Sequence, residues 1–506
     1  MGAAYGRTVV SGPEGHEAET SEPGSTSALE QGVSPASPDR PARHADTTSL
    51  FGLFALLFAL SLILHQLWWD GFEVLPAHFL VILTALWTAL RPTSVVRFLT
   101  MIAAEVLSVA LDMPEVGSHT LLVLVSCACM LTYVGWTTLV TRRLPGAGTL
   151  FERVAPFLRV QLLLVYAAAA VAKMNTGFFD GDISCAAFMS SQVAWFHSAL
   201  LDGSWRVAPS IWGTVLIEVA LPVLLAVPRT RVLGLVVGAA FHTLLALAGN
   251  VPFSALALAL YVAFLPTDVP GRLRALAARR PGLGRWARRA RRWAGSPAAF
   301  PAAAGCWLAG AVIFSFHPTV GGALISHGSR LLIVLVALAT GILLALGLVR
   351  GGPLVYPPRS LRLGHPVFAV GILLLVANSL SPYLGLKTES SFTMFSNLQT
   401  EDGYWNHAFI PEAIRVFPYQ DQLVRITDSN DRALEERTQD GTRLVRFELE
   451  RYLRLHPGTS ATYTTAIPAG ETTQTTEPES AAPSATPILD RIMKFRDVRP
   501  PDSPGC

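Results

Sequence analysis

The sequence predicts an all-α bundle of membrane-spanning helices, followed by a small extracytoplasmic region of mixed α and β structure. Three observations predict this fold class. The 506-residue chain is 51% hydrophobic and only 15% of its residues are charged, whereas soluble domains average about 25% charged residues. Apolar runs of roughly the 20 residues that a bilayer requires recur between residues 50 and 385. The segments on either side of this range are polar.

Eleven apolar runs can be distinguished. We expect about eleven transmembrane helices within residues 49–385, because lipid offers no hydrogen bonds to an exposed backbone and a single crossing must therefore be helical. Two of the runs, 74–90 and 251–266, are short for a complete span. The runs are 50–69, 74–90, 95–111, 119–140, 154–173, 209–227, 230–248, 251–266, 296–317, 328–349 and 365–385.

Arginines gather in every second loop between these runs, and acids gather in the others. The most basic loop, 271–292, has nine arginines and no acid. Under the positive-inside rule, this alternation predicts a multi-pass protein of the plasma membrane with a cytoplasmic N-terminus and an extracytoplasmic C-terminus. We expect the basic loop to orient the chain and to touch anionic lipid, and we expect no nucleic-acid partner. The acids of the predicted outer loops are Asp70, Glu73, Asp112, Glu115, Asp180 and Asp182.

The segments outside the bundle differ in composition. Residues 1–48 are rich in Ser, Pro, Glu and Gly, which predicts a disordered cytoplasmic segment. Residues 386–456 should form a small extracytoplasmic domain, in which LVRITDSND and TRLVRFELE predict a strand and then a strand or short helix, separated by an Asp-Gly turn. Residues 457–487, rich in Thr, Pro, Glu and Ala, predict a flexible linker. Residues 488–506 are a short tail that is expected to dock back.

The five cysteines show neither metal-ligand spacing nor a CxxC motif, and we expect no metal site. Cys185 and Cys506 both fall in predicted outer segments, where the environment permits a disulfide between them. Cys127, Cys129 and Cys306 lie in apolar runs, and we expect them to be small buried residues.

Lys173 is the polar residue that most needs an explanation. It ends an apolar run, and it is one of only three lysines among 39 basic residues. One interpretation is snorkelling, in which the stem stays in lipid and the ammonium reaches water. Another follows from Arg159, Tyr166 and Lys173, which are seven residues apart and so fall on one helix face. A polar stripe on an apolar helix faces other helices or a cavity.

Other polar residues in the apolar runs could reach the same depth as Lys173. His119 begins one run at its outer end, His242 lies in the outer part of another, and Glu105 and Glu218 lie near the middle of theirs. Each alone is explained by a hydrogen bond between helices, but together they predict a polar pocket in an apolar wall. A desolvated lysine loses its proton far more readily than arginine, which favours proton transfer.

Several segments resemble vitamin K-dependent gamma-carboxylase and the wider HTTM (horizontally transferred transmembrane) domain family. RVQLLLVYAAAAVAKMNTGFFDG (159–181) is similar to the helix with the family's catalytic lysine, and GSHTLLVLVS (117–126) to the segment with its active-site histidine. TVLIEVALPVLLAVPRTRVLGLV (214–236) and AFHTLLALAGNVPFSALALALYVAFLP (240–266) follow in order. The likeness covers roughly 90–270, and ESSFTMFSNLQTEDGYWNH (389–407) looks like a stretch of bacterial HTTM-like proteins.

The resemblance implies a reaction and roles for these residues. Lys173 would be the catalytic base that deprotonates a reduced naphthoquinone of the vitamin K or menaquinol type, and His119 would support an anionic intermediate. Oxygenation of the quinol would then generate a base strong enough to carboxylate a glutamate, which is lyase chemistry. We expect His242, Glu218, Arg159 and Tyr166 to contribute to binding, with the bilayer, a lipid quinone and a peptide or protein on the outer face as partners.

The sequence departs from the family pattern in two places beside the lysine. Ala172 stands where the family has a second lysine, and Asn175 stands where it has an aspartate. The large outer domain that grips the substrate in the animal carboxylases is mostly missing. Quinol chemistry is therefore the firmer expectation, and peptide carboxylation the weaker one.

Two other classes of function remain open. In the first, the protein is a non-catalytic membrane scaffold or binding module, Lys173 snorkels, and the outer domain meets a partner through Phe392, Met394, Phe395, Asn397 and Asn406. In the second, the protein is a transporter, but the sequence shows no inverted repeat and no paired broken helices.

Overall fold

The structure is a computed structural model, and it describes residues 40–69, 76–193, 204–279, 281–349, 355–356, 360–439, 441–467, 470–476 and 487–499. The predicted disordered segment therefore falls mostly outside the described residues, and α1 begins within it, at Arg40. Asp70, Glu73 and Cys506 also lie outside the described residues.

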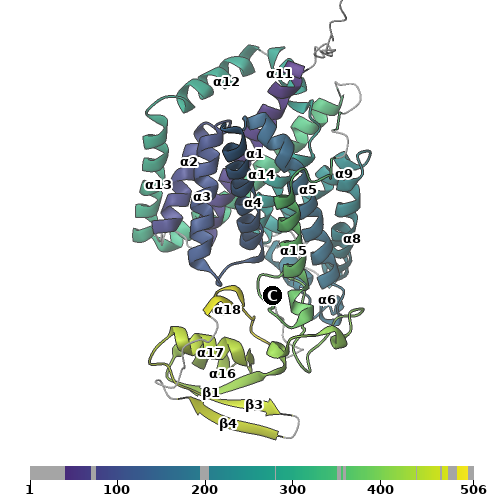
Figure 1. Ribbon diagram of the computed structural model, residues 1–506, viewed down its shortest axis with the longest axis vertical. Coiled ribbons are helices and arrows are strands. Elements are labelled where there is room, and N and C mark those ends of the chain that lie inside the picture. Colours follow the sequence, from purple (N-terminus) through teal and green to yellow (C-terminus); the bar gives the residue numbers. More distant parts are fainter. Residues whose placement is uncertain are drawn as a thin grey trace, which may run out of the picture. The chain divides into compact units, whose positions relative to one another are not determined.

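Each of the eleven apolar runs forms a helix (Figure 1). Ser94 caps the third of these helices, since its side chain accepts a hydrogen bond from the backbone N–H of Arg97. Gly385 ends the eleventh with a φ of 81°, which glycine adopts without strain. The helices are α1 (Arg40–Trp69), α2 (Pro76–Leu90), α3 (Val95–Asp112), α4 (Ser118–Thr141), α5 (Ala147–Ala172), α8 (Val207–Ala226), α9 (Arg231–Leu247), α10 (Val251–Tyr261), α13 (Ala299–Phe316), α14 (Pro318–Val349) and α15 (Pro366–Leu384).

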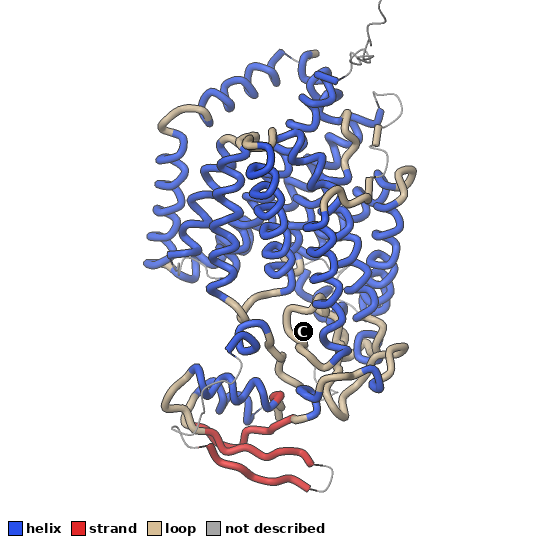
Figure 2. Tube along the Cα trace, viewed as in Figure 1, coloured by secondary structure: helices blue, strands red, loops and turns tan. Residues whose placement is uncertain are grey.

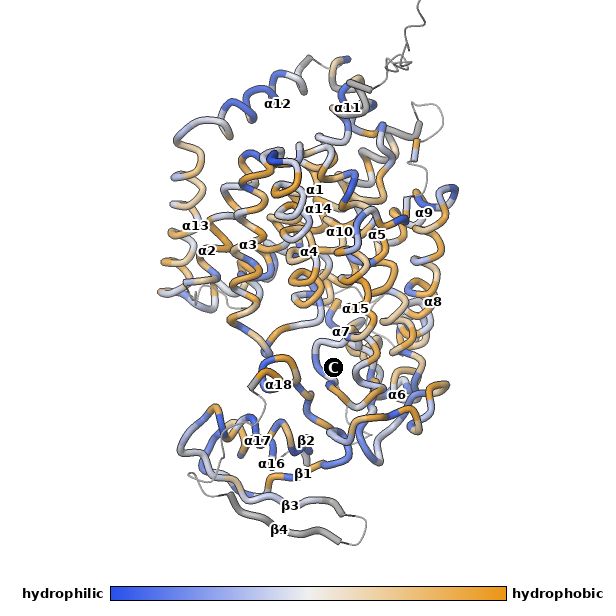
Figure 3. The backbone as a smooth tube through the Cα atoms, viewed as in Figure 1, coloured by the Kyte–Doolittle hydropathy of each residue, from blue (hydrophilic) through white to orange (hydrophobic). Residues whose placement is uncertain are grey.

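Shorter helices occupy several of the connections. The short α6 and α7 follow α5, and the arginine-rich α11 and α12 follow α10. Five of the 14 residues of α12 are arginines, and Figure 3 shows this helix as largely hydrophilic beside the apolar helices. These helices and the 3-10 turns beside them are α6 (Thr176–Phe179), α7 (Cys185–Gln192), η2 (Ser204–Arg206), η3 (Val262–Phe264), α11 (Val269–Ala278) and α12 (Pro281–Ala294).

Seven helices in the described part of the chain are long and apolar enough to cross a membrane, or eight if the pair Val251–Phe264 and Val269–Ala275, bent by 90°, counts as one span. The other predicted spans do not meet the criteria of length and low charge for a membrane-crossing helix. The apolar helices α2 and α9 have 15 and 17 residues. Helix α3 carries three charged side chains, from Arg97, Glu105 and Asp112. The protein is thus a helical bundle of multi-pass membrane type, while the count of eleven spans stays a prediction.

The core of the bundle is aromatic and aliphatic. Phe51, Phe54 and Phe58 of α1 pack against Phe98 of α3, with the Phe51 and Phe98 ring centroids 5.3 Å apart. Phe151 of α5 lies 6.0 Å from Phe54. Such offset and edge-on pairs add about 0.5–1.5 kcal/mol each beyond the area that they bury. In contrast, α13 and α14 expose most of their apolar side chains, as lipid-facing helices do.

The C-terminal region contains all the strands of the described chain (Figure 2). Its antiparallel sheet has the order β2-β1-β3-β4 and is packed with three helices. The elements are η4 (Glu412–Ile414), η5 (Pro418–Asp421), β1 (Leu423–Ser429), α16 (Arg432–Gln439), β2 (Leu444–Val445), α17 (Arg446–Leu455), β3 (Ala461–Ile467), β4 (Gly470–Thr476) and α18 (Pro487–Ile492).

The predicted linker, 457–487, requires a correction. Residues 461–467 and 470–476 within it form β3 and β4, which pair with each other from Ala461–Thr476 to Ile467–Gly470. The threonines that suggested a linker are β-branched and favour strands, and in this hairpin they face one another in cross-strand pairs. Composition alone could not distinguish these alternatives.

The tail docks back, as expected. Met493, Phe495 and Val498 are buried against Leu423 and Val445 of the sheet. The tail also reaches the bundle, because Lys494 pairs with the carboxylate of Glu115, which lies between α3 and α4. Arg451 of α17 pairs with the same carboxylate.

Candidate functional site

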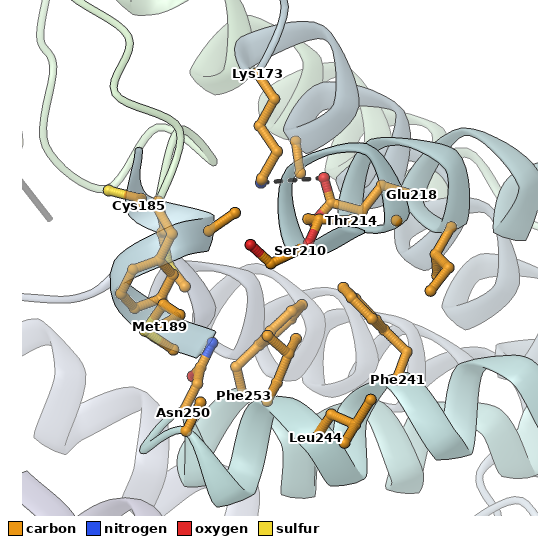
Figure 4. A pocket seen from close by; sticks show the side chains of 18 of the residues that line it. Lys173, Cys185, Met189, Ser210, Thr214, Glu218, Phe241, Leu244, Asn250 and Phe253 are labelled. Carbon is orange, nitrogen blue, oxygen red and sulfur yellow. Dashed lines mark ion pairs between the residues drawn. The ribbon is translucent and has the colours of Figure 1, made fainter. Parts of the chain in front are cut away.

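The Lys173 side chain does not snorkel to the surface but points into the bundle. It follows the last turn of α5, and its backbone N–H still donates to the carbonyl of Ala169. Its ammonium nitrogen Nζ lies 3.0 Å from Oε2 of Glu218 on α8, the helix packed beside α5 (Figure 4). Lys173 is 3% and Glu218 is 7% exposed. The pair is therefore a buried salt bridge whose two members come from different helices.

The Lys173–Glu218 pair borders a cavity of about 300 Å³, at the lower limit for small-molecule sites. We call it the lysine cavity. Figure 4 shows Phe241, Leu244 and Phe253 across the cavity from the pair. Ser210, Thr214 and Asn250 are among the few polar groups in its wall. The remaining apolar lining includes Leu122, Val165, Phe178, Met189, Ile217, Leu245, Phe392, Met394 and Phe395.

His119 of α4 lines the same cavity, as predicted from the sequence. Its Nε2 lies 3.1 Å from Nδ1 of His65 on α1, so the N–H of one imidazole donates a hydrogen bond to the ring nitrogen of the other. His65 was not singled out in the sequence, because a single histidine near the end of an apolar run gives no signal by itself. The cavity therefore brings together a lysine, a carboxylate and one member of a histidine pair.

His242 and Tyr166 form a separate group behind the cavity wall. The Tyr166 hydroxyl is 2.5 Å from Nε2 of His242 and 2.5 Å from the hydroxyl of Tyr261. Gly238 makes this arrangement possible, because a Cβ at this position would collide with the Tyr261 ring. Neither Tyr166 nor His242 lines the lysine cavity. Their hydrogen bonds join α5, α9 and α10, and their predicted role in binding stays a prediction.

Arg159 is also not at the lysine cavity, although it shares a helix face with Lys173. It lies 14 residues earlier on α5, which is about 21 Å along the axis at 1.5 Å per residue. Its guanidinium donates to the carbonyls of Ala263 and Ser360, at 2.6 and 2.7 Å. Heptad spacing predicted the common face correctly but not a common site. The buried Glu105 of α3 is likewise absent from the cavity lining.

The segment 390–397 covers one side of the lysine cavity and has an unusual backbone. Ser390, Phe392, Phe395 and Asn397 all have φ between 53° and 61°, a conformation that costs residues other than glycine about 1–3 kcal/mol each. Asn397 holds the segment in place, since its side chain accepts from the Cys185 N–H at 2.8 Å and donates to the Ile183 carbonyl at 2.9 Å. Backbone strain of this kind clusters at functional sites.

Asn175, two residues after Lys173, has a structural role. Its Nδ2 donates to the carbonyls of Ala172 and Ser396, and its Oδ1 accepts from the N–H of Phe178. An aspartate carboxylate could not donate the first two hydrogen bonds. The asparagine therefore joins the end of α5 to the 390–397 segment and positions Lys173.

A second, more polar cavity of about 970 Å³ adjoins the lysine cavity. Its lining includes Glu401, Arg496 and Arg499 from the C-terminal region and its tail. The two cavities share part of their walls, so a ligand in one lies next to a ligand in the other. The shared residues are Ser118, His119, Cys185, Asn250, Met394 and Phe395. Cys185 is disulfide-bonded, and its predicted pairing with Cys506 concerns a residue outside the described part of the chain.

The lysine cavity is mainly apolar and has few polar groups in its wall. Its aromatic walls favour a flat apolar molecule, and the Lys173–Glu218 pair offers one group that donates and one that accepts a proton. Within the described residues, no group of three or more His, Cys, Asp or Glu side chains is arranged to hold a metal ion.

Comparison with known proteins does not assign the chain to a family. No protein-family model, no curated protein and no solved structure matches the chain.

Proposed function

We propose that this protein is an integral membrane enzyme that removes a proton from a lipid-soluble quinol, with Lys173 as the base and Glu218 as its partner. One observation supports the proposal above the others: Lys173 and Glu218 form a buried pair, 3.0 Å apart, at the wall of an apolar cavity. Other ion pairs of the described chain, such as Arg496 with Glu401, border the polar cavity, whereas Lys173 and Glu218 are both buried and border the apolar one.

The proposed step is a simple proton transfer. The pair can hold its single proton on the Glu218 carboxyl, which leaves the Lys173 amine free to accept another. When a substrate hydroxyl enters, its O–H bond breaks, a new N–H bond forms at Lys173, and the electron pair stays on the substrate oxygen. Glu218 would keep its proton in this step, and its carboxyl oxygen would accept a hydrogen bond from the resulting ammonium. The apolar walls exclude water, which strengthens these charge interactions.

The substrate class in this proposal comes from the resemblance to the HTTM and vitamin K-dependent carboxylase family. A reduced naphthoquinone would supply, with dioxygen, the oxidative chemistry that the resemblance implies. In the narrower form of the proposal, the polar cavity would receive a glutamate-bearing peptide for carboxylation. We place the protein in the plasma membrane, with its N-terminus cytoplasmic and its C-terminal region outside, from the distribution of arginines.

The alternative, a non-catalytic scaffold, finds less support in the geometry. Its proposed contact residues are engaged within the molecule: Phe392, Met394 and Phe395 line the lysine cavity. The Asn397 side chain forms hydrogen bonds to the backbone of Ile183 and Cys185. The Asn406 side chain donates to the Asn175 side chain and to the Asn397 carbonyl. They are therefore not free to form an outer docking surface.

The test is reconstitution of the full chain in lipid nanodiscs with a reduced naphthoquinone and oxygen, while quinol consumption is followed by absorbance. We expect wild type to consume quinol and Lys173→Ala to lose at least about 100-fold, the usual range for a general base. Lys387→Ala is the matched control, because Lys387 is a lysine outside the cavity lining and its loss should leave turnover unchanged.

Two results would contradict the proposal. Equal turnover in wild type and Lys173→Ala would show that the amine is not the base. Absence of turnover in a folded wild-type protein, across both vitamin K and menaquinol types of substrate, would remove quinol chemistry.

A further inference from the structure

A third cavity, which we call the arginine cavity, lies around Arg159, two heptads from Lys173 along α5. Its volume is about 610 Å³. Its walls combine arginines with apolar groups from α1, α5 and the chain before α15. The lining includes Phe151, Arg153, Arg159, Tyr356, Ser360 and Arg362.

Two buried guanidinium groups converge on Ser360 at this cavity. Arg159 donates to its carbonyl at 2.7 Å, and Arg231 donates to its hydroxyl at 3.1 Å. Arg159 is 4% exposed and Arg231 is 0% exposed. Both arginines otherwise donate to backbone carbonyls. Among the described residues, neither has a carboxylate partner within ion-pair distance.

The missing negative charge is not supplied nearby. Asp268 is engaged by Arg272 at 2.6 Å, and the one acid in the cavity lining, Glu152, is solvent-exposed. The neighbouring ranges outside the described residues, 350–354 and 357–359, contain no acid in their sequences, RGGPL and PPR. Burial of an unpaired charge costs several kcal/mol. Two such charges side by side therefore indicate an anion that is bound there in the working protein.

One polar atom in the cavity wall lacks a partner: the Tyr356 hydroxyl is buried with no hydrogen bond among the described residues. Arg231 does not itself line the cavity, but its Nη1 is likewise buried without a partner among the described residues. The Arg231 guanidinium lies 4.7 Å from the Tyr356 ring centroid, so the two side chains form one unit. Buried polar groups are nearly always hydrogen-bonded, and these two unmatched donors point to a ligand with several acceptor oxygens.

We propose that the arginine cavity binds a phosphate group. Phosphate matches the planar fork of donors that arginine presents. Arg153 and Arg362, both exposed, would guide it in, and Tyr356 would complete its hydrogen bonds. Leu50, Phe151, Leu265 and Leu363 add an apolar wall suited to the glycerol and acyl part of an anionic phospholipid, for which basic pockets between membrane helices are known sites. The same donors would also accept free phosphate.

The test uses the purified full chain in neutral detergent and measures thermal unfolding. Phosphatidylglycerol is titrated in one arm, phosphatidylcholine in a second, and inorganic phosphate at constant ionic strength in a third. We expect phosphatidylglycerol to raise Tm saturably and phosphatidylcholine to leave it unchanged. A rise with inorganic phosphate as well would identify free phosphate as a sufficient ligand, whereas a rise with the lipid alone would identify a head group.

Variants then locate the binding site. Tyr356→Phe removes only a hydroxyl that has no partner among the described residues, so folding should be preserved, and we expect about tenfold weaker binding from the loss of one hydrogen bond to a charged group. The double variant R153Q/R362Q changes two exposed residues and should weaken binding further. The control is R288Q/R289Q, which removes two exposed arginines from α12 and should leave the dissociation constant unchanged.

The proposal is independent of the lysine cavity, and it can fail clearly. It is overturned if no arm raises Tm, if both cavity variants bind as wild type does, or if R288Q/R289Q weakens binding as much as they do. The last result would place the lipid on the surface of α12.

Discussion

At the scale of single residues, the most informative position is Lys173, because a lysine and an arginine at this position would differ in their ability to act as a base. Both would carry a positive charge toward Glu218, but arginine does not give up its proton in proteins. The geometry puts the amine at a cavity wall rather than in solvent. If Lys173 is a base, its amine must be able to lose its proton. If Lys173 only forms a structural salt bridge, its amine can stay charged.

We therefore predict that Lys173→Arg keeps the fold and abolishes quinol turnover. The expected loss is at least about 100-fold, measured in the nanodisc assay, while Tm falls less than in Lys173→Ala because a charge partner for Glu218 remains. Full activity in the arginine variant would mean that Lys173 serves only as a counter-ion.

Lys387, next to the end of α15, gives a prediction for pH. Burial lowers the pKa of the Lys387 amine to about 8 from its ordinary 10.5. Below about pH 8, the folded protein carries a desolvated ammonium that the unfolded chain hydrates, and folding is weakened. This loss of stability disappears as the pH rises from about 8 to 10.5, because the Lys387 amine then becomes neutral in the unfolded chain as well.

Lys387→Met should accordingly raise the stability at pH 7 by at most about 3 kcal/mol. Thermal unfolding of both proteins between pH 7 and pH 11 checks this, and the two curves should converge at the upper end. A constant difference in Tm across that range would mean that packing, not charge, is responsible.

At the scale of elements, the 390–397 segment determines the shape of the lysine cavity. Three of its four left-handed residues, Ser390, Phe392 and Asn397, form hydrogen bonds to other segments. Their partners are the chain just before α4, the first residue of α4, the first residue of α7 and the chain before α7. A segment under strain keeps its shape only while those contacts exist. The side chain of Asn397 forms two of these hydrogen bonds. Substitutions at Asn397 can therefore distinguish the effect of backbone strain from the effect of hydrogen bonding.

Asn397→Ala should destabilise the protein by roughly 2–4 kcal/mol, from two lost hydrogen bonds and the cost of a left-handed alanine. Asn397→Gly loses the same hydrogen bonds without that backbone cost, so it should be about 1 kcal/mol more stable than the alanine variant. Denaturant unfolding of both variants measures the difference. Equal stability of the two would show that the positive φ carries no strain.

At the scale of the whole molecule, Glu115 connects the C-terminal region to the helical bundle. Burial alone would raise the pKa of its carboxyl, but hydrogen bonds from Lys494 and Arg451 lower it below the ordinary 4.5. Because the folded pKa is lowered, the contribution to stability is present above pH 4.5 and is lost as the pH falls below it.

Glu115→Gln should reproduce at neutral pH what acid does to the wild type. We expect faster hydrogen exchange in α17 and in residues 487–499, with the bundle unchanged. The control is Glu436→Gln, which removes an exposed pair with Arg432 inside α16 and should leave both segments protected. Unchanged exchange in Glu115→Gln would mean that the sheet and tail dock through other contacts.

The sequence by itself determined where the helices lie and which of their faces are polar. Apolar length and heptad spacing are local properties, and they placed all eleven helices and put Arg159, Tyr166 and Lys173 on one face. Local patterns could not separate the β3–β4 hairpin from a linker, since threonine suits both until a neighbouring strand is present.

Only the tertiary structure decided which polar residues share a site. The packing of α5 beside α8 brought Glu218 to Lys173, and α1 brought His65 to His119. Because Arg159 and Lys173 are far apart along α5, Arg159 lines a different cavity. A residue's own helix face can be read from its neighbours in sequence, but its partners depend on the angles and distances between helices, which arise from packing over the whole chain.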